Sequence, residues 1–337
     1  MRPAVVAFSA ALVGLSACEP QDQSLVLKGK TMGTTYSVTI AEELTTQQQR
    51  ALQLDIDRRL AAINASMSSY DKASELSRFN QSGKTDWIPV SADLCNVVSE
   101  ALRITQLTQG AFDITVAAAT NAWGFGAAVA SGETPSITAG SGQIMVQASP
   151  PAIRKLQPAT TIDVAAIAKG YAVDEIAALL NATGLQHYLV EIGGEIRASG
   201  ERSAGGWWRI AIESPDLENG EPQYIVKLAN EAVATSGDYR NFYIRDGQRF
   251  AHLIDPDTQK PVTHPLALVS VIADNAISSD ALATGLMVLG PEKGFALARQ
   301  QNLAALFIRR DVDGFSARMT AAFAAQLQPN QESLPVD

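Results

Sequence analysis

The sequence is poor in the residues that build thiol and zinc chemistry. It holds two cysteines and three histidines in 337 residues. Two cysteines cannot form a disulfide framework, and no spacing of His, Cys and Glu along the chain is typical of a zinc site. Cys95 falls in an apolar helical pattern, so we expect a buried thiol and not a nucleophile. Any catalytic chemistry therefore has to come from something other than a thiol or a zinc site.

Positive charge is also scarce. The chain has 26 Lys and Arg against 35 Asp and Glu, a net charge of −9 at pH 7, and no cluster of basic residues. This balance excludes the basic surface that nucleic-acid binding needs, so we expect no nucleic-acid partner. An anionic ligand would require locally placed cations or a metal ion.

Three common catalytic and nucleotide-binding fingerprints are missing. The chain contains neither the phosphate-binding loop G-x4-G-K-[ST] nor the dinucleotide fingerprint G-x-G-x-x-G. It also lacks the Gly-x-Ser-x-Gly motif of many serine hydrolases. Dinucleotide-dependent oxidoreductases and serine hydrolases of these types therefore have no support in the sequence.

The N-terminus is typical of a targeting segment. Arg2 supplies the charged start, and the apolar run from Ala4 to Leu15 is too short to span a bilayer. The run ends in Leu15-Ser-Ala-Cys18, which resembles a bacterial lipobox. We expect residues 1–18 to be a lipoprotein signal peptide with Cys18 lipidated, so that the mature protein works outside the cytoplasm. An ordinary secretory signal cut nearby is the alternative.

The rest of the chain predicts one large domain. With 46% hydrophobic residues it can bury a substantial core. We expect a polar tether at 19–28, a domain at 29–325 and a C-terminal tail at 326–337. Amphipathic helices at 47–67 and from Ser91 alternate with hairpin-type strands, which predicts an α+β fold with a largely antiparallel sheet.

The stretch from Thr161 to Asp174 is the first candidate site. It reads as a strand closed by Asp163, a turn of small residues, and a helix with Lys169 in its first turn. A helix N-terminus offers free amides and partial positive charge, to which the lysine adds a full charge, and this combination suits phosphate. A plain strand–turn–helix connection with a surface lysine is the alternative.

Asp280 and Thr284 form the second candidate site. They stand four residues apart on a helix predicted to open at Ser279, so both project from one face. Two oxygen ligands from one helical turn suit a hard cation such as Mg²⁺. The alternative is that Asp280 favours a helix N-terminus electrostatically while Thr284 packs.

His252 is a candidate general base, because its ordinary pKa lies near working pH and Asp255 follows three residues later. A turn histidine with local hydrogen bonds is the alternative. Four aromatic residues also lie beside loops and glycines, where one could stack on a planar ring, although filling the core is the commoner role for each alone: Tyr70, Phe112, Trp123 and Phe125.

Taken together, these segments resemble the ApbE family, the FAD:protein FMN transferases. The resemblance covers about residues 29 to 320, and its pieces occur in the family's order. They are Met32-Gly-Thr-Thr-Tyr36, Gly110-Ala-Phe-Asp113, Trp123-Gly-Phe-Gly126, Asp163 to Asp174, Gly193-Gly194, Ser236-Gly-Asp-Tyr-Arg240, His252-Leu-Ile-Asp-Pro256 and Asp280-Ala-Leu-Ala-Thr284.

The resemblance implies an ApbE-like fold with the ligand in a cleft between subdomains. It implies Mg²⁺-dependent transfer of the FMN half of FAD to a Thr or Ser hydroxyl of an acceptor protein, with release of AMP. Asp280 and His252 would be catalytic, and Asp280, Thr284 and the Ala166 carbonyl would bind the metal. FAD, the substrate, would be bound by Met32, Tyr70, Ala111, Phe112, Asp113, Asp163, Lys169 and Ile254.

One position departs from the family pattern. Some relatives carry an acidic residue just before the threonine, whereas this chain has Ala283, which leaves a metal with fewer charged ligands. The resemblance further implies acceptors among redox proteins of the bacterial cell envelope, and a lipid-anchored enzyme facing the periplasm on the inner membrane. Two alternatives stay open: an FAD pyrophosphatase that uses water as acceptor, and a non-catalytic lipid-anchored flavin-binding protein.

Overall fold

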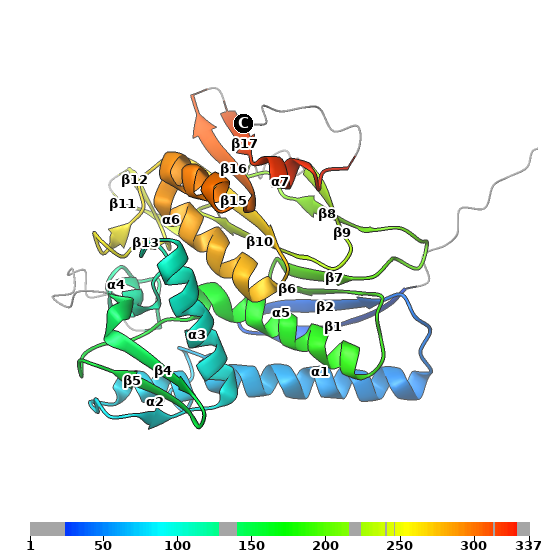
Figure 1. Cartoon of the computed structure of the whole chain (residues 1–337), viewed down its shortest axis with the longest axis horizontal. Coiled ribbons are helices and arrows are strands. Elements are labelled where there is room, and N and C mark those ends of the chain that lie inside the picture. Colours follow the sequence, from blue (N-terminus) through cyan, green and yellow to red (C-terminus); the bar gives the residue numbers. More distant parts are fainter. Residues whose placement is uncertain are drawn as a thin grey trace, which may run out of the picture.

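The computed structural model describes residues 24–127, 140–215, 224–239, 241–245, 247–312 and 314–328 (Figure 1). Its centre is an eight-stranded sheet in which every neighbouring pair is antiparallel. In spatial order the strands are β1 (Leu25–Thr31), β2 (Thr34–Ile40), β6 (Tyr188–Ile192), β7 (Glu195–Ser199), β10 (Ala232–Gly237), β15 (Leu266–Ala273), β16 (Ala304–Asp311) and β17 (Gly314–Met319).

Helices and small sheets surround this sheet (Figure 1). The helices are α1 (Thr46–Met67), α2 (Glu75–Gln81), α3 (Ala92–Leu107), α4 (Ala117–Ala122), α5 (Ala165–Ala182), α6 (Ala276–Gln300) and α7 (Ala321–Ala324), with 3-10 turns η1 (Ile114–Val116) and η2 (Ser141–Gln143). The short strands are β3 (Ile88–Pro89), β4 (Ile144–Ala148), β5 (Pro151–Lys155), β8 (Trp208–Ile212), β9 (Tyr224–Leu228), β11 (Phe242–Arg245), β12 (Gln248–Ala251), β13 (Ile254–Asp255) and β14 (Lys260–Pro261).

Strand β15 is apolar on both faces because both faces of the sheet are covered. Val269 and Val271 join the larger core with helices α5 and α6. The alternate residues Leu268 and Ile272 join a second core with the β8–β9 hairpin. Since successive side chains of a strand point to opposite faces, the helices and the hairpin cover opposite sides of the sheet. This double cover explains the continuous hydrophobic run that predicts the strand.

Helices α5 and α6 cross in direct backbone contact. A Cβ added at Gly170 would lie 2.2 Å from the carbonyl oxygen of Ala276, so only glycine allows this approach. Asp174 of α5 accepts hydrogen bonds from the amides of Ala276 and Ile277 at 3.0 and 2.8 Å, which satisfies free amides at the start of α6. The two helices therefore have a fixed register.

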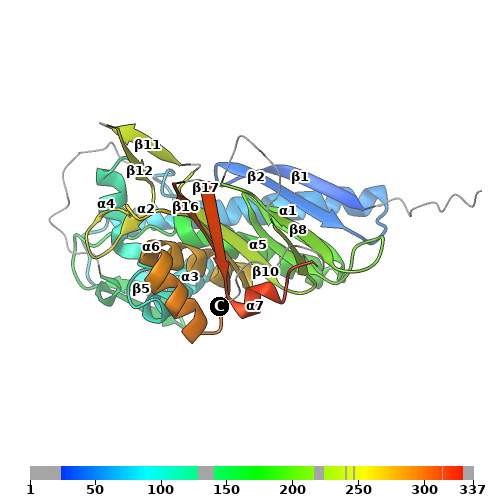
Figure 2. The same cartoon turned by 90° about the horizontal axis from the view of Figure 1, so that it is seen from above.

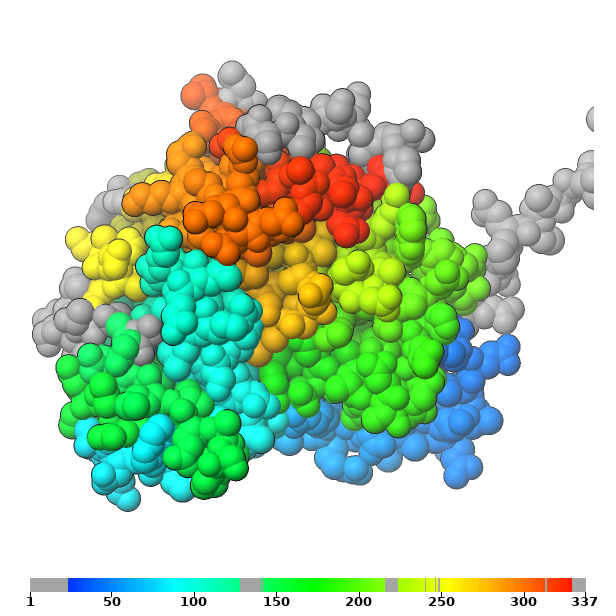
Figure 3. Space-filling model, viewed as in Figure 1, coloured from blue at the N-terminus to red at the C-terminus, as the bar shows by residue number. Residues whose placement is uncertain are grey.

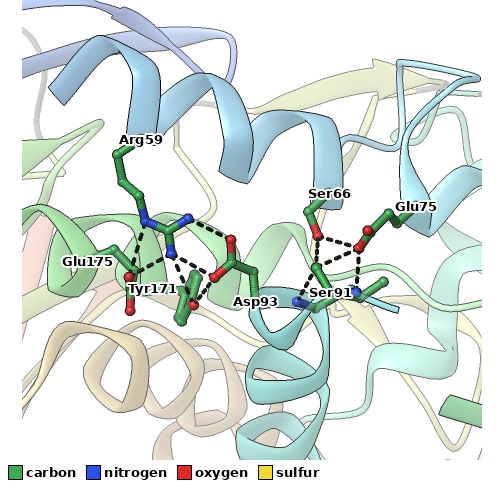
Figure 4. A network of polar contacts seen from close by, with 8 residues as sticks. Arg59, Ser66, Glu75, Ser91, Asp93, Tyr171 and Glu175 are labelled. Carbon is green, nitrogen blue, oxygen red and sulfur yellow. Dashed lines mark hydrogen bonds and ion pairs between the residues drawn. The ribbon is translucent and has the colours of Figure 1, made fainter. Parts of the chain in front are cut away.

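A network of polar side chains joins α1, α3 and α5 (Figure 4). Arg59 of α1 donates to Asp93 of α3 and Glu175 of α5, each at 2.6 Å. Tyr171 of α5 donates to Asp93 at 2.7 Å. The three charged groups are partly buried, and the network connects the long outer helix to the helix layer beneath it. Figure 3 shows α3 and α6 side by side on the same face of the molecule.

Helix α1 and helix α3 confirm the two predicted amphipathic helices, with Thr45 and Ser91 as side-chain N-caps. Four assignments are wrong. Residues 25–28 belong to strand β1 and not to a tether, and 30–40 form a hairpin that turns at Met32 and Gly33. Residues 161–164 form no strand. The segment 326–328 is no free tail, because it pairs with β9 through backbone hydrogen bonds.

The sequence analysis does not predict several other elements, among them β4, β5, β7 and β17. The signal segment with Cys18 and the end of the tail lie outside the described residues. Among the helices that the structure describes, none combines the length and hydropathy that a bilayer span requires.

Seen from above, the β11–β12 hairpin stands at the edge of the molecule, apart from the main sheet (Figure 2).

Candidate active site

A cavity of about 610 Å³ lies where the segment from Ala111 to Phe125, the start of α5, the strands β7, β8 and β10, and helix α6 meet. The described residues that line it include most of the site residues predicted from the sequence: Tyr70, Ala111, Phe112, Asp113, Asp163, Ala166, Lys169, His252, Ile254, Asp280 and Thr284. Met32 is not part of this lining. It occupies the β1–β2 turn and packs against the main core.

The N-terminus of α5 opens onto this cavity. Asp163 accepts a hydrogen bond from the Ala165 amide at 2.9 Å, and its own amide donates to the Ile114 carbonyl at 2.7 Å. Burial raises the pKa of Asp163. The helix starts at Ala165, so Lys169 lies in its second turn and not in the first, as the sequence had suggested. The lysine therefore reaches the cavity from the side of the helix.

Asp280 and Thr284 face the same cavity from α6. The helix starts at Ala276 and not at Ser279, because Asn275 caps it through the Ser278 amide. Asp280 is consequently a buried residue inside the helix, 3% exposed, and has no helix-capping role. Burial raises the pKa of its carboxyl group. Thr284 shares a 2.9 Å hydrogen bond with Ser236 of β10.

The backbone beside Asp280 leaves the Ala166 carbonyl available. In an α-helix the Gly170 amide would donate to the carbonyl of Ala166. Here that amide donates to Asp280 Oδ2 at 3.0 Å, so Ala166 has at most a shared donor. A carboxylate, a hydroxyl and a carbonyl from α5 and α6 thus line one wall of the cavity.

These donors fit a magnesium ion. Mg²⁺ prefers oxygen ligands and is usually bound through one or two carboxylates, with water and substrate phosphates completing its shell. The described part of the chain holds no group of three or more His, Cys, Asp or Glu side chains arranged for a metal. A metal here would therefore use Asp280 with the Thr284 hydroxyl and the Ala166 carbonyl. At position 283, the alanine is fully buried and adds no charge.

Lys169 lies between two buried carboxylates. Its ammonium group is 2.9 Å from Glu195 Oε1 and 3.9 Å from Asp280 Oδ1. Burial alone would lower the pKa of Lys169, but the charges of Asp280 and Glu195 outweigh this and raise it, so the lysine stays protonated. The charge of Lys169 is thus already matched by protein carboxylates.

His252 has the environment of a proton acceptor. Its Nδ1 lies 3.2 Å from the Asn241 carbonyl, which can only accept, so Nδ1 carries the proton and Nε2 keeps a lone pair. Burial lowers the pKa of His252, so the neutral form prevails at pH 7. The Asn241 carbonyl, and not Asp255 three residues later in the chain, is thus the group bonded to this ring, and the Asp255 carboxylate accepts from the Asp257 amide. The edge of the Phe125 ring packs on His252.

Most aromatic candidates are committed to packing. Phe112 is 3% exposed within the main core. Phe125 stacks on Tyr243, and Trp123 stacks on Phe250 beside it. Tyr70, in contrast, is 75% exposed and lines the cavity. Among the predicted aromatics, Tyr70 has the free ring face that stacking on a planar ligand needs.

Six carboxylate side chains line the cavity. Among the described lining residues, Lys169 is the one residue that is a lysine or an arginine. The acidic residues are Asp113, Asp163, Glu191, Glu195, Glu213 and Asp280. An anionic ligand would meet repulsion here unless a cation bound with it. An anionic ligand in this cavity would therefore be favoured by a cation bound with it.

Three residues of the site were not identified as such from the sequence. Glu195 follows the Gly193–Gly194 turn, Ser236 hydrogen-bonds to Thr284, and Asn241 orients His252 through its carbonyl. The glycine pair and the Ser236-Gly-Asp segment were visible as motifs. Only the strand pairing that brings β7 and β10 next to α5 and α6 gives these residues a role.

Comparisons with known proteins identify the family of the chain. The sequence model of the ApbE family matches residues 32–307. A Vibrio cholerae protein named FAD:protein FMN transferase is 38% identical over 96% of this chain and 98% of its own length. A Haemophilus influenzae protein of the same name is also 38% identical, over 95% of this chain and 96% of its length.

Solved structures give the same result. The flavin transferase ApbE from Vibrio cholerae superimposes with a TM-score of 0.83 at 38% identity, covering 90% of this chain and 99% of that one. The apo form of the flavinyl transferase ApbE from Pseudomonas stutzeri gives 0.81 at 35% identity, covering 90% and 97%. The chain belongs to the ApbE family.

Proposed function

We propose that this flavin transferase moves the FMN moiety of FAD to a Thr or Ser hydroxyl of an acceptor protein, with Mg²⁺ as cofactor and AMP as leaving group. The family and the names of its relatives support flavin transfer. The observation that carries the finer proposal is the meeting of Asp280, Thr284, Ala166 and Lys169 on one wall of a single cavity. Cleaving a diphosphate depends mainly on charge neutralisation and positioning, which a divalent cation held by this wall would supply.

In the proposed reaction the acceptor hydroxyl oxygen attacks the phosphorus of the FMN half. The bond from that phosphorus to the bridging oxygen breaks, and AMP leaves with the electron pair. Mg²⁺ held by Asp280, Thr284 and the Ala166 carbonyl would neutralise charge on the diphosphate. His252 Nε2 takes the hydroxyl proton, because its lone pair is free and its partner Asn241 keeps the other nitrogen protonated.

The proposal extends to the FAD contacts. Asp113, Asp163 and Ile254 line the cavity with Ala111 and Tyr70, and the exposed ring of Tyr70 can stack on the planar isoalloxazine or adenine. Met32 lies outside the lining, so its contact with FAD would require movement of the β1–β2 turn.

We further propose that the protein is lipid-anchored through Cys18 and faces the periplasm on the inner membrane. The lipobox-like sequence at 15–18 supports this localisation. Acceptors would then be redox proteins of the cell envelope that carry a Thr or Ser flavinylation site.

One assay separates transfer from the alternatives. The purified protein is incubated with FAD, Mg²⁺ and an envelope redox protein, with and without a chelator. A transferase gives AMP and covalently bound flavin in equal amounts, and the chelator abolishes both. Free FMN with AMP would identify a pyrophosphatase, and unchanged FAD would leave a binding protein.

A further inference from the structure

Lys169 has two anionic partners at different distances, and only one of them is a proposed metal ligand. Glu195 lies at 2.9 Å and Asp280 at 3.9 Å from the ammonium nitrogen. The carboxylate of Asp280 would have to serve a metal ion, whereas Glu195 lies on β7, across the cavity wall from α6. The position of Lys169 thus depends on which carboxylate attracts it more strongly.

The β6–β7 turn shapes the space that Lys169 occupies. Gly193 has a φ of 61°, and a Cβ added there would lie 3.4 Å from Lys169 Cδ and 2.9 Å from Thr34 Cγ2. The positive φ and the close approach of Thr34 favour glycine here, and the aliphatic stem of Lys169 passes within contact distance of the turn. Two residues later, Glu195 receives the ammonium head. Stem and head are both positioned by one turn.

Glu195 is committed to this task. Its side chain is 5% exposed, and Oε1 bonds to Lys169. Its other oxygen, Oε2, is buried without a hydrogen-bond partner in the described structure. A buried carboxylate with one unpartnered oxygen destabilises the folded protein, because the lost hydration free energy is not fully offset by hydrogen bonds. Lys169 is the cation that offsets this cost, which makes the pair mutually dependent.

We propose that Glu195 is a positioning residue that holds Lys169 away from Asp280, so that the Asp280 carboxylate stays free for the divalent cation. This inference rests on the proposed function, because it takes the metal site from there. Without the charge of Glu195, the lysine would move toward the remaining carboxylate and compete with the metal for it. Glu195 then determines metal affinity without touching the metal.

The test measures Mn²⁺ binding to the protein in the absence of FAD, by electron paramagnetic resonance of free Mn²⁺. Glu195→Gln keeps the shape of the side chain and removes its charge. We expect it to bind Mn²⁺ about tenfold more weakly, as is typical when an outer-shell partner of a metal site is lost. Glu43→Gln, which removes an exposed charge elsewhere, should bind like the wild type.

The decisive variant removes the competitor as well. Lys169→Met combined with Glu195→Gln should recover Mn²⁺ affinity to within about threefold of the wild type, because no ammonium group is left to occupy Asp280. A purely structural role of Glu195 would leave the double variant as weak as the single one, and that result would overturn the proposal. Unchanged binding by Glu195→Gln would also overturn it.

The two proposals fail in different ways. If the wild-type protein bound no Mn²⁺, the metal site itself would be refuted, and this inference with it. If wild type and Glu195→Gln bound Mn²⁺ equally, the metal site would stand and only the role of Glu195 would fall. Activity assays over a range of Mg²⁺ concentrations add a second readout. The loss of transfer activity in Glu195→Gln should diminish as the Mg²⁺ concentration is raised to saturation.

Discussion

Asp280 is buried in a cavity wall that already contains other carboxylates, and burial raises its pKa. Such a group is poorly stabilised as an anion by the protein alone. Among the described residues, its polar partners are the Gly170 amide and the more distant Lys169 ammonium group. A bound divalent cation would supply the missing stabilisation, so Asp280 is the residue whose loss should affect the reaction most directly.

Replacing Asp280 by alanine should reduce Mg²⁺-dependent FMN transfer at least about 100-fold, because the charged metal ligand is lost. The rate of AMP release with FAD and an acceptor protein measures this. Asp274→Asn serves as control, since Asp274 is exposed and does not line the cavity. Full activity of Asp280→Ala would remove this residue from the metal site.

The environment of His252 predicts how the rate of transfer depends on pH. Because burial lowers its pKa, the neutral form that can accept a proton persists to more acidic pH than for an ordinary histidine. The kcat/KM of transfer should therefore stay high at pH 7 and fall only below about pH 6.5, as the ring becomes protonated.

The control for this profile is a histidine outside the cavity. His252→Asn should lose about 100-fold or more in rate and should lack the acid limb. His187→Asn should keep both, since His187 is exposed and is not part of the described lining. An unchanged acid limb in His252→Asn would assign the base to another group.

Residue types and spacing were enough to single out Asp280, Thr284, Lys169 and His252. Their surroundings were not predictable, because partners such as Glu195 and the Asn241 carbonyl come from strands and loops distant in sequence. The proposed partner of His252 shows the limit. Asp255 is near in sequence, yet its carboxylate completes a local turn.

At the scale of elements, the crossing of α5 and α6 sets the site. Gly170 lies at the contact, one residue after Lys169, and its amide bonds to Asp280. Helix periodicity predicts both helices but says nothing about their close approach. The start of α6 was placed three residues late, because Asn275 as N-cap is less conspicuous than Ser279 followed by Asp280.

Gly170→Ala should destabilise the protein by about 1–3 kcal/mol, because the added Cβ would lie 2.2 Å from the Ala276 carbonyl oxygen and 2.8 Å from Asp280 Cβ. This overpacking exceeds the gain of roughly 0.5–1 kcal/mol that alanine normally brings to a helix. Chemical denaturation measures the change. Gly83→Ala, where nothing lies within 4 Å of the added Cβ, should be nearly neutral. Equal stability of both variants would contradict the close crossing.

The polar network of Figure 4 makes a prediction for the helix layer. Arg59→Met would leave Asp93 and Glu175 without their cation. We expect a loss of about 1–3 kcal/mol in the free energy of unfolding, since these groups are partly buried and two carboxylates would lose their cation. Arg58→Met is a matched control, because Arg58 is 76% exposed in its pair with Asp55. Similar losses in both variants would show that the network adds no stability.

The sequence predicts well those elements whose hydrophobic residues follow one period throughout. It does not predict a chain reversal that leaves the period unchanged. Strand β15 and helix α1 have continuous signals. The alternation across 30–40 hides the turn at Met32 and Gly33, because a hairpin keeps the period of two on both sides of it. Thr161 and Ile162 look like a strand but have no neighbouring strand to pair with in the described structure.

For the whole molecule, the acidic cavity predicts coupling between the two ligands. Six carboxylates in the lining oppose a diphosphate, and a divalent cation bound at Asp280 would reduce this repulsion. FAD should therefore bind at least about tenfold more tightly with Mg²⁺ than with a chelator at matched ionic strength. The affinity of the protein for Mg²⁺ should rise by the same factor when FAD is bound. Quenching of flavin fluorescence measures the affinity. Equal affinity under both conditions would exclude coupling.

The overall architecture followed from the order of short motifs and their resemblance to a family, more than from any single element. A largely antiparallel α+β fold was expected and is present. The sheet order was not predictable, because it joins strands that are far apart in sequence, such as β2 with β6 and β7 with β10. That order brings Glu195 and Ser236 to the cavity.

The most direct test of the account is a crystal structure of the protein with FAD and Mn²⁺, read from the anomalous signal of the metal. We expect a metal peak about 2.1 Å from oxygens of Asp280, Thr284 and Ala166, with the FAD diphosphate in its coordination shell beside Lys169. A diphosphate bound away from Thr284 and Lys169, or a metal held elsewhere, would contradict it.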